Sequence, residues 1–136
     1  MTKTLGKLLP RIFLAAAPLL LAASPAGAQQ PPWTLPAPDY GGAKPLNREA
    51  WYTFDDYPMA AIRAGAQGYV TVSFEILPNG RVGKCKVTRS SRHRSLDTVL
   101  CPLLKRRARF EPARGADGSP VQTTGTTSMS FWMPKS

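Results

Sequence analysis

The feature that most constrains the fold is a pair of strands joined by a tight turn. Apolar and polar residues alternate from Gly68 to Ile76, the pattern of a β-strand with one buried face. Pro78-Asn79-Gly80 then predicts a hairpin turn, because Asn and Gly tolerate the positive φ angles that such turns need. A second strand is expected from Arg81 to Thr88, so this region should form an antiparallel hairpin.

Two helices are predicted on either side of this hairpin. The acidic pair Asp55 and Asp56, followed by a proline, is a helix-start signal, and a short helix should cover residues 59–64. The second helix should begin at a Ser95 cap, and its apolar residues recur with the spacing of one buried face. That face comprises Leu96, Val99, Leu100, Leu103 and Leu104. Pro102 interrupts it, so we expect a kink or a helix split in two.

A last strand is predicted from Val121 to Met133, after a loop at residues 115–120. The order is then helix, strand, strand, helix, strand. The simplest assembly is an α+β fold in which a small antiparallel three-stranded sheet carries two helices on one face.

Residues 1–28 have the three parts of a secretory signal peptide. A positively charged start precedes an apolar run from Ile12 to Ala23, and Ala26-Gly27-Ala28 supplies a small-residue cleavage site. The run is shorter than the roughly 20 apolar residues of a membrane span. We therefore expect a periplasmic protein that is cleaved before Gln29. The alternative is an uncleaved N-terminus that anchors the chain in the inner membrane.

The part after the signal peptide divides into two regions. Residues 29–50 are rich in proline and are predicted to form a semi-rigid tether, while residues 51–136 should form the folded domain. The two cysteines, Cys85 and Cys101, predict a disulfide in an oxidising compartment, worth about 3 kcal/mol, with two free buried thiols as the alternative. A metal site is not expected, since His93 is the sole histidine and no further thiol exists.

The domain resembles the C-terminal domain of the TonB family of energy transducers over about residues 57–133. The resemblance rests on the order and spacing of short motifs. These are Tyr57-Pro58, Gly68-Tyr69-Val70-Thr71-Val72-Ser73-Phe74, Asn79-Gly80-Arg81-Val82, Ser90-Ser91, Leu96-Asp97, Arg109-Phe110-Glu111-Pro112-Ala113 and Gly118-Ser119-Pro120-Val121. Family membership implies a periplasmic domain linked to TonB-dependent transport across the outer membrane. It also implies binding of the TonB box, a short segment of outer-membrane transporters, as an added β-strand.

The last strand is the candidate binding edge for such a segment. An exposed edge offers unpaired backbone N–H and C=O groups to any extended peptide, and this stretch has no charged residue to block pairing. The candidate residues are Thr123, Thr124, Gly125, Thr126, Thr127, Ser128, Met129, Ser130 and Phe131. The alternatives are an edge that is already covered, or one that pairs with a second copy of the chain.

The N-terminal part departs from the family. The first segment looks cleavable and lacks the Ser and His pattern by which the family's anchor helix engages its motor, and the proline-rich stretch is much shorter than the family's spacer. These differences indicate a stand-alone TonB-like domain that binds periplasmic proteins or peptides without driving transport. The alternative is a structural protein, homodimeric or bound to anionic envelope material, with no role in energy transduction.

Basic residues concentrate between residues 84 and 109, where Asp97 is the only acid among nine cations. The predicted basic patch comprises Lys84, Lys86, Arg89, Arg92, Arg94, Lys105, Arg106, Arg107 and Arg109. Nucleic acid is not the expected partner, because the chain is exported and the run lacks aromatic residues that stack on bases. Catalysis and a cofactor are not expected either, since neither a nucleophile nor a carboxylate has recognisable spacing to His93.

Mass spectrometry of the exported protein tests the signal-peptide prediction. Cleavage removes three of the 18 Lys and Arg and none of the 8 acidic residues, which lowers the net charge from +10 to +7. We expect a mature chain that starts at Gln29. Recovery of an intact chain beginning with Met1 would favour the membrane-anchored alternative.

Overall fold

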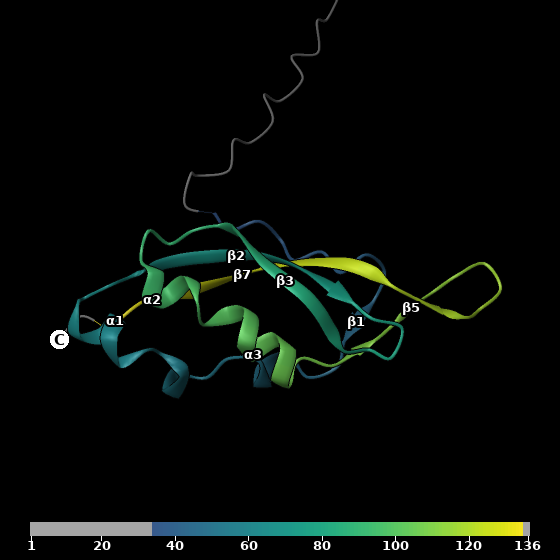
Figure 1. The fold of residues 1–136 in the computed structure, drawn as a ribbon, viewed down its shortest axis with the longest axis horizontal. Helices are drawn as coiled ribbons and strands as arrows, with labels where there is room; N and C mark the ends of the chain where they lie inside the picture. The colour runs from purple at the N-terminus through teal and green to yellow at the C-terminus, as the bar shows by residue number, and fades with distance from the viewer. Residues whose placement is uncertain (1–33, 135–136) are drawn as a thin grey trace, which may run out of the picture. The chain divides into compact units, whose positions relative to one another are not determined.

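The computed structural model describes residues 34–134; the predicted signal peptide lies outside this range. The helices and strands follow one another along the chain as shown in Figure 1. They are β1 (Lys44–Pro45), η1 (Arg48–Ala50), η2 (Phe54–Asp56), α1 (Met59–Arg63), β2 (Gly68–Ile76), β3 (Val82–Arg89), α2 (Arg94–Asp97), α3 (Leu100–Arg107), β4 (Phe110–Glu111), β5 (Ala113–Arg114), β6 (Pro120–Val121) and β7 (Thr123–Phe131).

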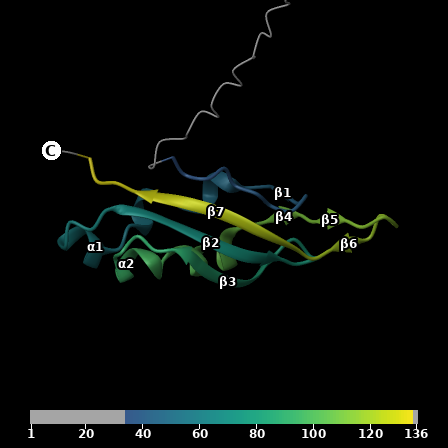
Figure 2. The same ribbon diagram turned by 90° about the horizontal axis from the view of Figure 1, so that it is seen from above.

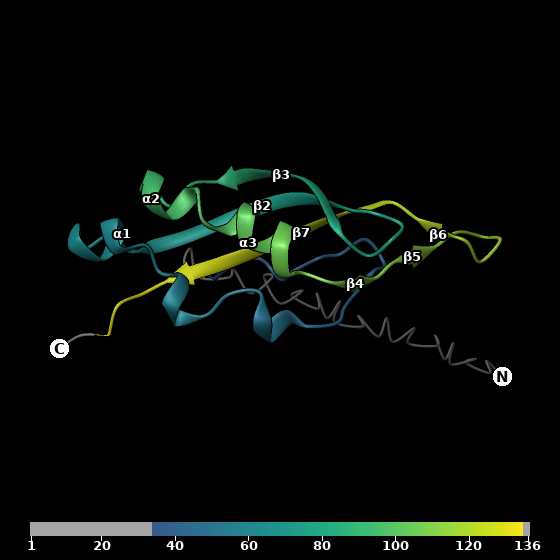
Figure 3. The ribbon, with the colours of Figure 1, turned by 60° about the horizontal axis from the view of Figure 1, so that its bottom comes forward.

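The main sheet has three antiparallel strands in the order β3-β2-β7, with β2 at its centre. β2 pairs with β7 along its whole length, from Gly68 opposite Phe131 to Ile76 opposite Thr123. Helices α2 and α3 lie on one side of this sheet (Figures 1 and 3). The predicted α+β fold is therefore confirmed, including the three-stranded antiparallel sheet.

The core lies between the sheet and these helices. The alternation predicted for β2 is present, since Val70, Val72, Phe74 and Ile76 are all buried. They face the apolar helical residues, of which Leu96, Leu100, Leu103 and Leu104 are buried as well. Burying a side chain of this size contributes about 1.5–3 kcal/mol, so this contact between β2 and the helices is a large source of the stability of the domain.

The predicted second helix is split into α2 and α3, with the break at Thr98 and Val99. Pro102 lies in the first turn of α3, where its missing N–H leaves no hydrogen bond unmade. The expected Ser95 cap is wrong: Ser95 lies inside α2, and His93 occupies the N-cap position without a side-chain cap hydrogen bond.

The predicted disulfide is confirmed: Cys85 in β3 is bonded to Cys101 in α3. The two residues are 16 positions apart and their Cα atoms lie 5.7 Å apart. In the chain-entropy view, closing a loop of this length stabilises the domain by about 3 kcal/mol. The bond also fixes the helical layer to the outer strand of the sheet.

The folded domain begins earlier than the predicted boundary at residue 51. Ala43 is buried, and β1 pairs with β4 through Lys44 opposite Glu111 and Pro45 opposite Phe110. Residues 39–50 therefore belong to the domain rather than to a tether. Proline is compatible with this role, because β1 pairs on one side only and does not need a donor at every position.

Tyr40 explains why this segment is held against the domain. Its ring packs edge-on against Trp51 at 5.9 Å between ring centroids and against Phe110 at 5.3 Å. Aromatic pairs in this geometry contribute about 0.5–1.5 kcal/mol beyond the burial of their area. The chain before Trp51 thus completes the core at the end of the sheet near β4.

The predicted hairpin turn forms, and only Gly80 within it has a positive φ, +79°. The Gly80 N–H donates to the Leu77 carbonyl at 2.8 Å, and the Asn79 side chain accepts from the Arg81 N–H at 3.0 Å. Gly80 also lies against the backbone of Phe110, whose N–H donates to the Gly80 carbonyl at 2.9 Å. A Cβ at this position would come within 2.1 Å of the Phe110 carbonyl oxygen.

Replacing Gly80 with alanine is expected to destabilise the domain by several kcal/mol. The energetic cost of a left-handed backbone at alanine and the cost of the clash with Phe110 add together. Gly118→Ala is the matched control: its φ is +82°, and nothing lies within 4 Å of the added Cβ. That variant should lose only about 1–2 kcal/mol. Urea unfolding measures both. Equal losses would contradict the close approach of Gly80 to Phe110.

Candidate functional site

β7 is an edge strand of the main sheet, since it pairs with β2 and with no further main-sheet strand among residues 34–134. Along an edge strand, alternate residues direct their N–H and C=O groups away from the sheet. Thr126 is one of these outward residues, because both of its backbone groups bond to a segment outside the sheet. The outward set therefore comprises Thr124, Thr126, Ser128 and Ser130.

The segment that meets this edge is the chain's own N-terminal part. Asp39 and Thr126 form an antiparallel bridge and exchange two backbone hydrogen bonds. The Asp39 N–H donates to the Thr126 carbonyl at 3.0 Å, and the Thr126 N–H donates to the Asp39 carbonyl at 2.6 Å. Figure 2 shows this N-terminal segment, in blue, on the side of β7 away from β2.

The candidate edge is thus interrupted in its middle. Next to the bridge, a Cβ on Gly41 would lie 3.0 Å from the Thr124 carbonyl oxygen, so this end is crowded by the same segment. Towards the C-terminal end of β7, no backbone hydrogen bond within residues 34–134 uses the outward groups of Ser128 or Ser130. Among residues 34–134, the C-terminal half of the edge is therefore the part that nothing covers.

On β7, the side chains that point to the sheet face away from the helices are small hydroxyls. Ser128 is bonded through its Oγ to the Thr71 Oγ1 at 2.8 Å, directly across the β2–β7 pair. Ser130 is exposed, and Trp132 beyond the strand is 63 % exposed. This arrangement leaves room along the edge and places no charged side chain on β7 itself.

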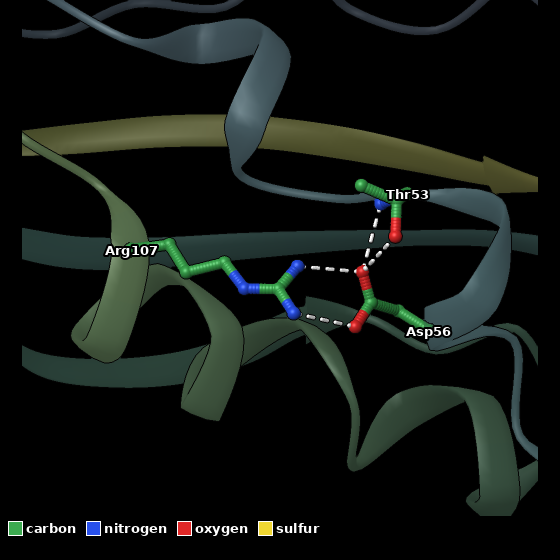
Figure 4. A network of polar contacts seen from close by, with 3 residues as sticks. All are labelled: Thr53, Asp56 and Arg107. Atoms are coloured by element: carbon green, nitrogen blue, oxygen red, sulfur yellow. Dashed lines mark hydrogen bonds and ion pairs between the residues drawn. The ribbon is translucent and has the colours of Figure 1, made fainter.

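A second polar site ties the N-terminal half of the domain to α3. The Asp56 carboxylate accepts from the Arg107 guanidinium twice, Nη1 to Oδ2 at 2.6 Å and Nη2 to Oδ1 at 2.9 Å. The same Oδ2 accepts from the backbone N–H and the hydroxyl of Thr53 at 2.8 and 2.9 Å (Figure 4). The hydrogen bonds from Arg107 are the main cause that lowers the pKa of Asp56 from 3.8 to about 2.

This site corrects the predicted role of the acidic pair. Asp56 lies in η2 and bonds Thr53 and Arg107, while the N-cap of α1 is Pro58 without a side-chain cap hydrogen bond. The distant partner explains the error, since Arg107 is 51 positions away along the chain.

Most of the predicted basic residues lie in β3, at the start of α2 and at the end of α3, while Arg92 precedes α2 and Arg109 follows α3. Three of these side chains have a partner in the domain: Arg107 pairs with Asp56, and Arg109 Nη1 donates to the Ala108 carbonyl at 2.8 Å. The Arg89 guanidinium lies over the Tyr69 ring at 4.6 Å from its centroid. His93 is exposed, and residues 34–134 contain no group of three His, Cys, Asp or Glu side chains placed to hold a metal ion. Within this part of the chain, no helix is both long and apolar enough to cross a membrane.

Together, these observations define a class: a small disulfide-linked α+β domain with one partly open strand edge. The chain belongs to the family of C-terminal domains of Gram-negative bacterial TonB proteins, whose sequence profile matches residues 55–133. This membership confirms the resemblance seen in the sequence. It also indicates a location in the bacterial envelope and a role in contacts with other proteins.

A solved structure supports the same assignment. The solution NMR structure of the Pseudomonas aeruginosa TonB C-terminal domain is 28% identical in sequence, with a TM-score of 0.55. The match covers 72% of this chain and 93% of that one. The search of curated proteins gave no match.

The Asp56–Arg107 pair predicts a pH-dependent contribution to stability. Because the folded pKa of Asp56 is lowered, the contribution is complete above pH 3.8 and is lost as the pH falls towards about 2. Asp56→Asn should lower the Tm by a few degrees at neutral pH, and its difference from wild type should shrink below pH 3.8.

Asp55→Asn is the matched control, since the exposed Asp55 carboxylate makes no hydrogen bond or ion pair within residues 34–134. Thermal melts followed by circular dichroism across this pH range measure both variants. A constant Tm difference for Asp56→Asn at every pH would contradict the proposed contribution.

Proposed function

We propose that this domain binds extended segments of periplasmic partner proteins by strand addition to β7, in connection with TonB-dependent transport across the outer membrane. The observation that carries the proposal is the sheet order β3-β2-β7, which leaves β7 at an edge with outward backbone groups at Ser128 and Ser130. A partner strand can pair with these groups, because such pairing needs only main-chain donors and acceptors.

The composition of β7 is suited to this role. Long or charged side chains on an edge strand hinder pairing with another chain, and β7 carries Thr, Ser and Gly with a few apolar residues. The partner class follows from the family: a TonB-box-like segment of an outer-membrane receptor, or a similar extended segment of another periplasmic protein.

Direct binding measurements test the proposal. The probes are synthetic peptides that carry the TonB box segments of outer-membrane receptors from the same bacterium, titrated into the purified protein by calorimetry. We expect saturable binding that Ser128→Pro weakens about tenfold, because proline removes an outward donor and leaves a partner carbonyl unpaired.

Ser128→Ala is the matched control. It keeps the backbone N–H and removes only the hydroxyl that bonds Thr71, so peptide affinity should stay close to that of wild type. Proline at position 128 should not disturb the fold, since the Ser128 N–H makes no hydrogen bond to β2. Absence of binding by the wild-type protein at high micromolar peptide would count against strand addition.

The same variants separate peptide binding from pairing between two copies of the chain. Light scattering after size exclusion gives the mass of the free protein. A dimer that Ser128→Pro converts to a monomer would assign the edge to self-association, and a monomer that binds peptide would support the proposed function.

A further inference from the structure

The residues that precede the domain core lie along the edge that a partner strand would need. We refer to residues 35–41 as the N-terminal strap. Asp39 of the strap holds the two outward backbone groups of Thr126, the central outward residue of β7. An added strand lies about 4.8 Å from its neighbour. A partner strand that pairs with Thr126 would therefore need the position that the strap occupies, and the two cannot be there at the same time.

We propose that the N-terminal strap is a built-in competitor for the β7 edge, which a partner strand must displace in order to pair along the full strand. This inference rests on the proposed function, since it concerns access to the same edge. It adds a regulatory contact formed by the chain's own residues.

The register of the strap supports this inference. Its antiparallel bridge places Asp39 opposite Thr126. A strap that extended this register would place Ala37 opposite Ser128 and Leu35 opposite Ser130, two pairs that are not hydrogen-bonded in the structure. Prolines stand at the two intervening positions, 36 and 38. In a strand of this register, residues 36 and 38 direct their nitrogen atoms away from β7. The N–H groups that these prolines lack are therefore not needed for pairing with β7.

The strap is held beside β7 by an anchor at its C-terminal end. Tyr40 packs against Trp51 and Phe110, and its carbonyl accepts a hydrogen bond from the Thr123 hydroxyl at 3.3 Å. A segment attached so close to its binding site has an effective concentration on the order of millimolar. Even weak pairing by the strap therefore competes with a partner that binds at micromolar concentration.

The contact is also weak enough to open. Asp39 provides the only backbone pair between the strap and β7 within the described residues, and both Ala37 and Asp39 are exposed. Gly41 and Gly42 follow with φ angles of +58° and +90°, a left-handed turn that directs the chain away from β7. The strap can therefore detach at Asp39 while Tyr40 stays packed in the core.

Peptide titrations with strap variants test the competition. Asp39→Pro removes the N–H that donates to Thr126, so the same TonB box peptides should bind this variant about fivefold more tightly than wild type. Ala37→Pro is the matched control, because the Ala37 N–H makes no backbone hydrogen bond within residues 34–134, and its affinity should equal that of wild type.

Asp39→Thr should act in the opposite direction. It keeps the backbone pair with Thr126, and its hydroxyl can accept from the Gly41 N–H, which bonds the Asp39 Oδ1 at 3.0 Å in wild type. Threonine is also favoured in strands where aspartate is disfavoured, so peptide affinity should fall about twofold. This variant keeps the competition testable if Asp39→Pro does not fold. A thermal melt of each variant establishes folding before titration.

Hydrogen exchange measured by NMR examines the strap without any peptide. The Thr126 amide should exchange more slowly than the outward amides of Ser128 and Ser130 in wild type, and its exchange should accelerate in Asp39→Pro. Equal exchange of these three amides in the wild-type protein would overturn the strap contact.

The peptide results distinguish the two proposals. Tighter binding by Asp39→Pro supports competition by the strap. Equal binding by wild type, Asp39→Pro and Asp39→Thr overturns the competition while strand addition to β7 stands. No peptide binding by wild type or by Asp39→Pro overturns strand addition itself, and the competitive role of the strap with it.

Discussion

The structure depends on one central strand. β2 is hydrogen-bonded on both sides, to β3 and to β7, and its apolar face forms much of the core under the helices. Every other element is positioned relative to it: α3 is fixed to β3 by the disulfide, and β7 is placed at the edge by its unbroken nine-residue pairing with β2. The edge is therefore held along its full length by β2, because it belongs to the most extensively paired part of the sheet.

The backbone groups of β7 fall into two sets that differ in their hydrogen-bond partners. Those that face β2 are paired along the whole strand, whereas of the outward ones, within residues 34–134, only those of Thr126 pair, with Asp39 of the same chain. Asp39 at Thr126 shows that this edge accepts an extended segment with ordinary antiparallel geometry. Under the proposed function, this self-pairing would compete with pairing to a partner strand at the same edge.

Much of the fold could be predicted because its signals are local. The alternation over β2, the turn before Arg81 and the buried face of α2 and α3 each depend on residues that are close in the sequence. The Asp56–Arg107 pair and the Asp39–Thr126 bridge could not be predicted in this way, since each joins residues far apart in the chain. The alternating prolines at 36 and 38 were a usable signal, because they restrict a strand to pairing through one edge.

The sequence by itself determined the order of the three main strands and their helices, the buried faces and the family, and it predicted the bond between the two cysteines. These follow from periodicity, turn chemistry, motif order and the presence of only two thiols. The tertiary structure alone decided where the domain begins and which outward groups of β7 are left unpaired by residues 34–134. Both depend on how the segment around Tyr40 packs against Trp51 and Phe110, and such packing is specified by three-dimensional contacts that no local pattern records.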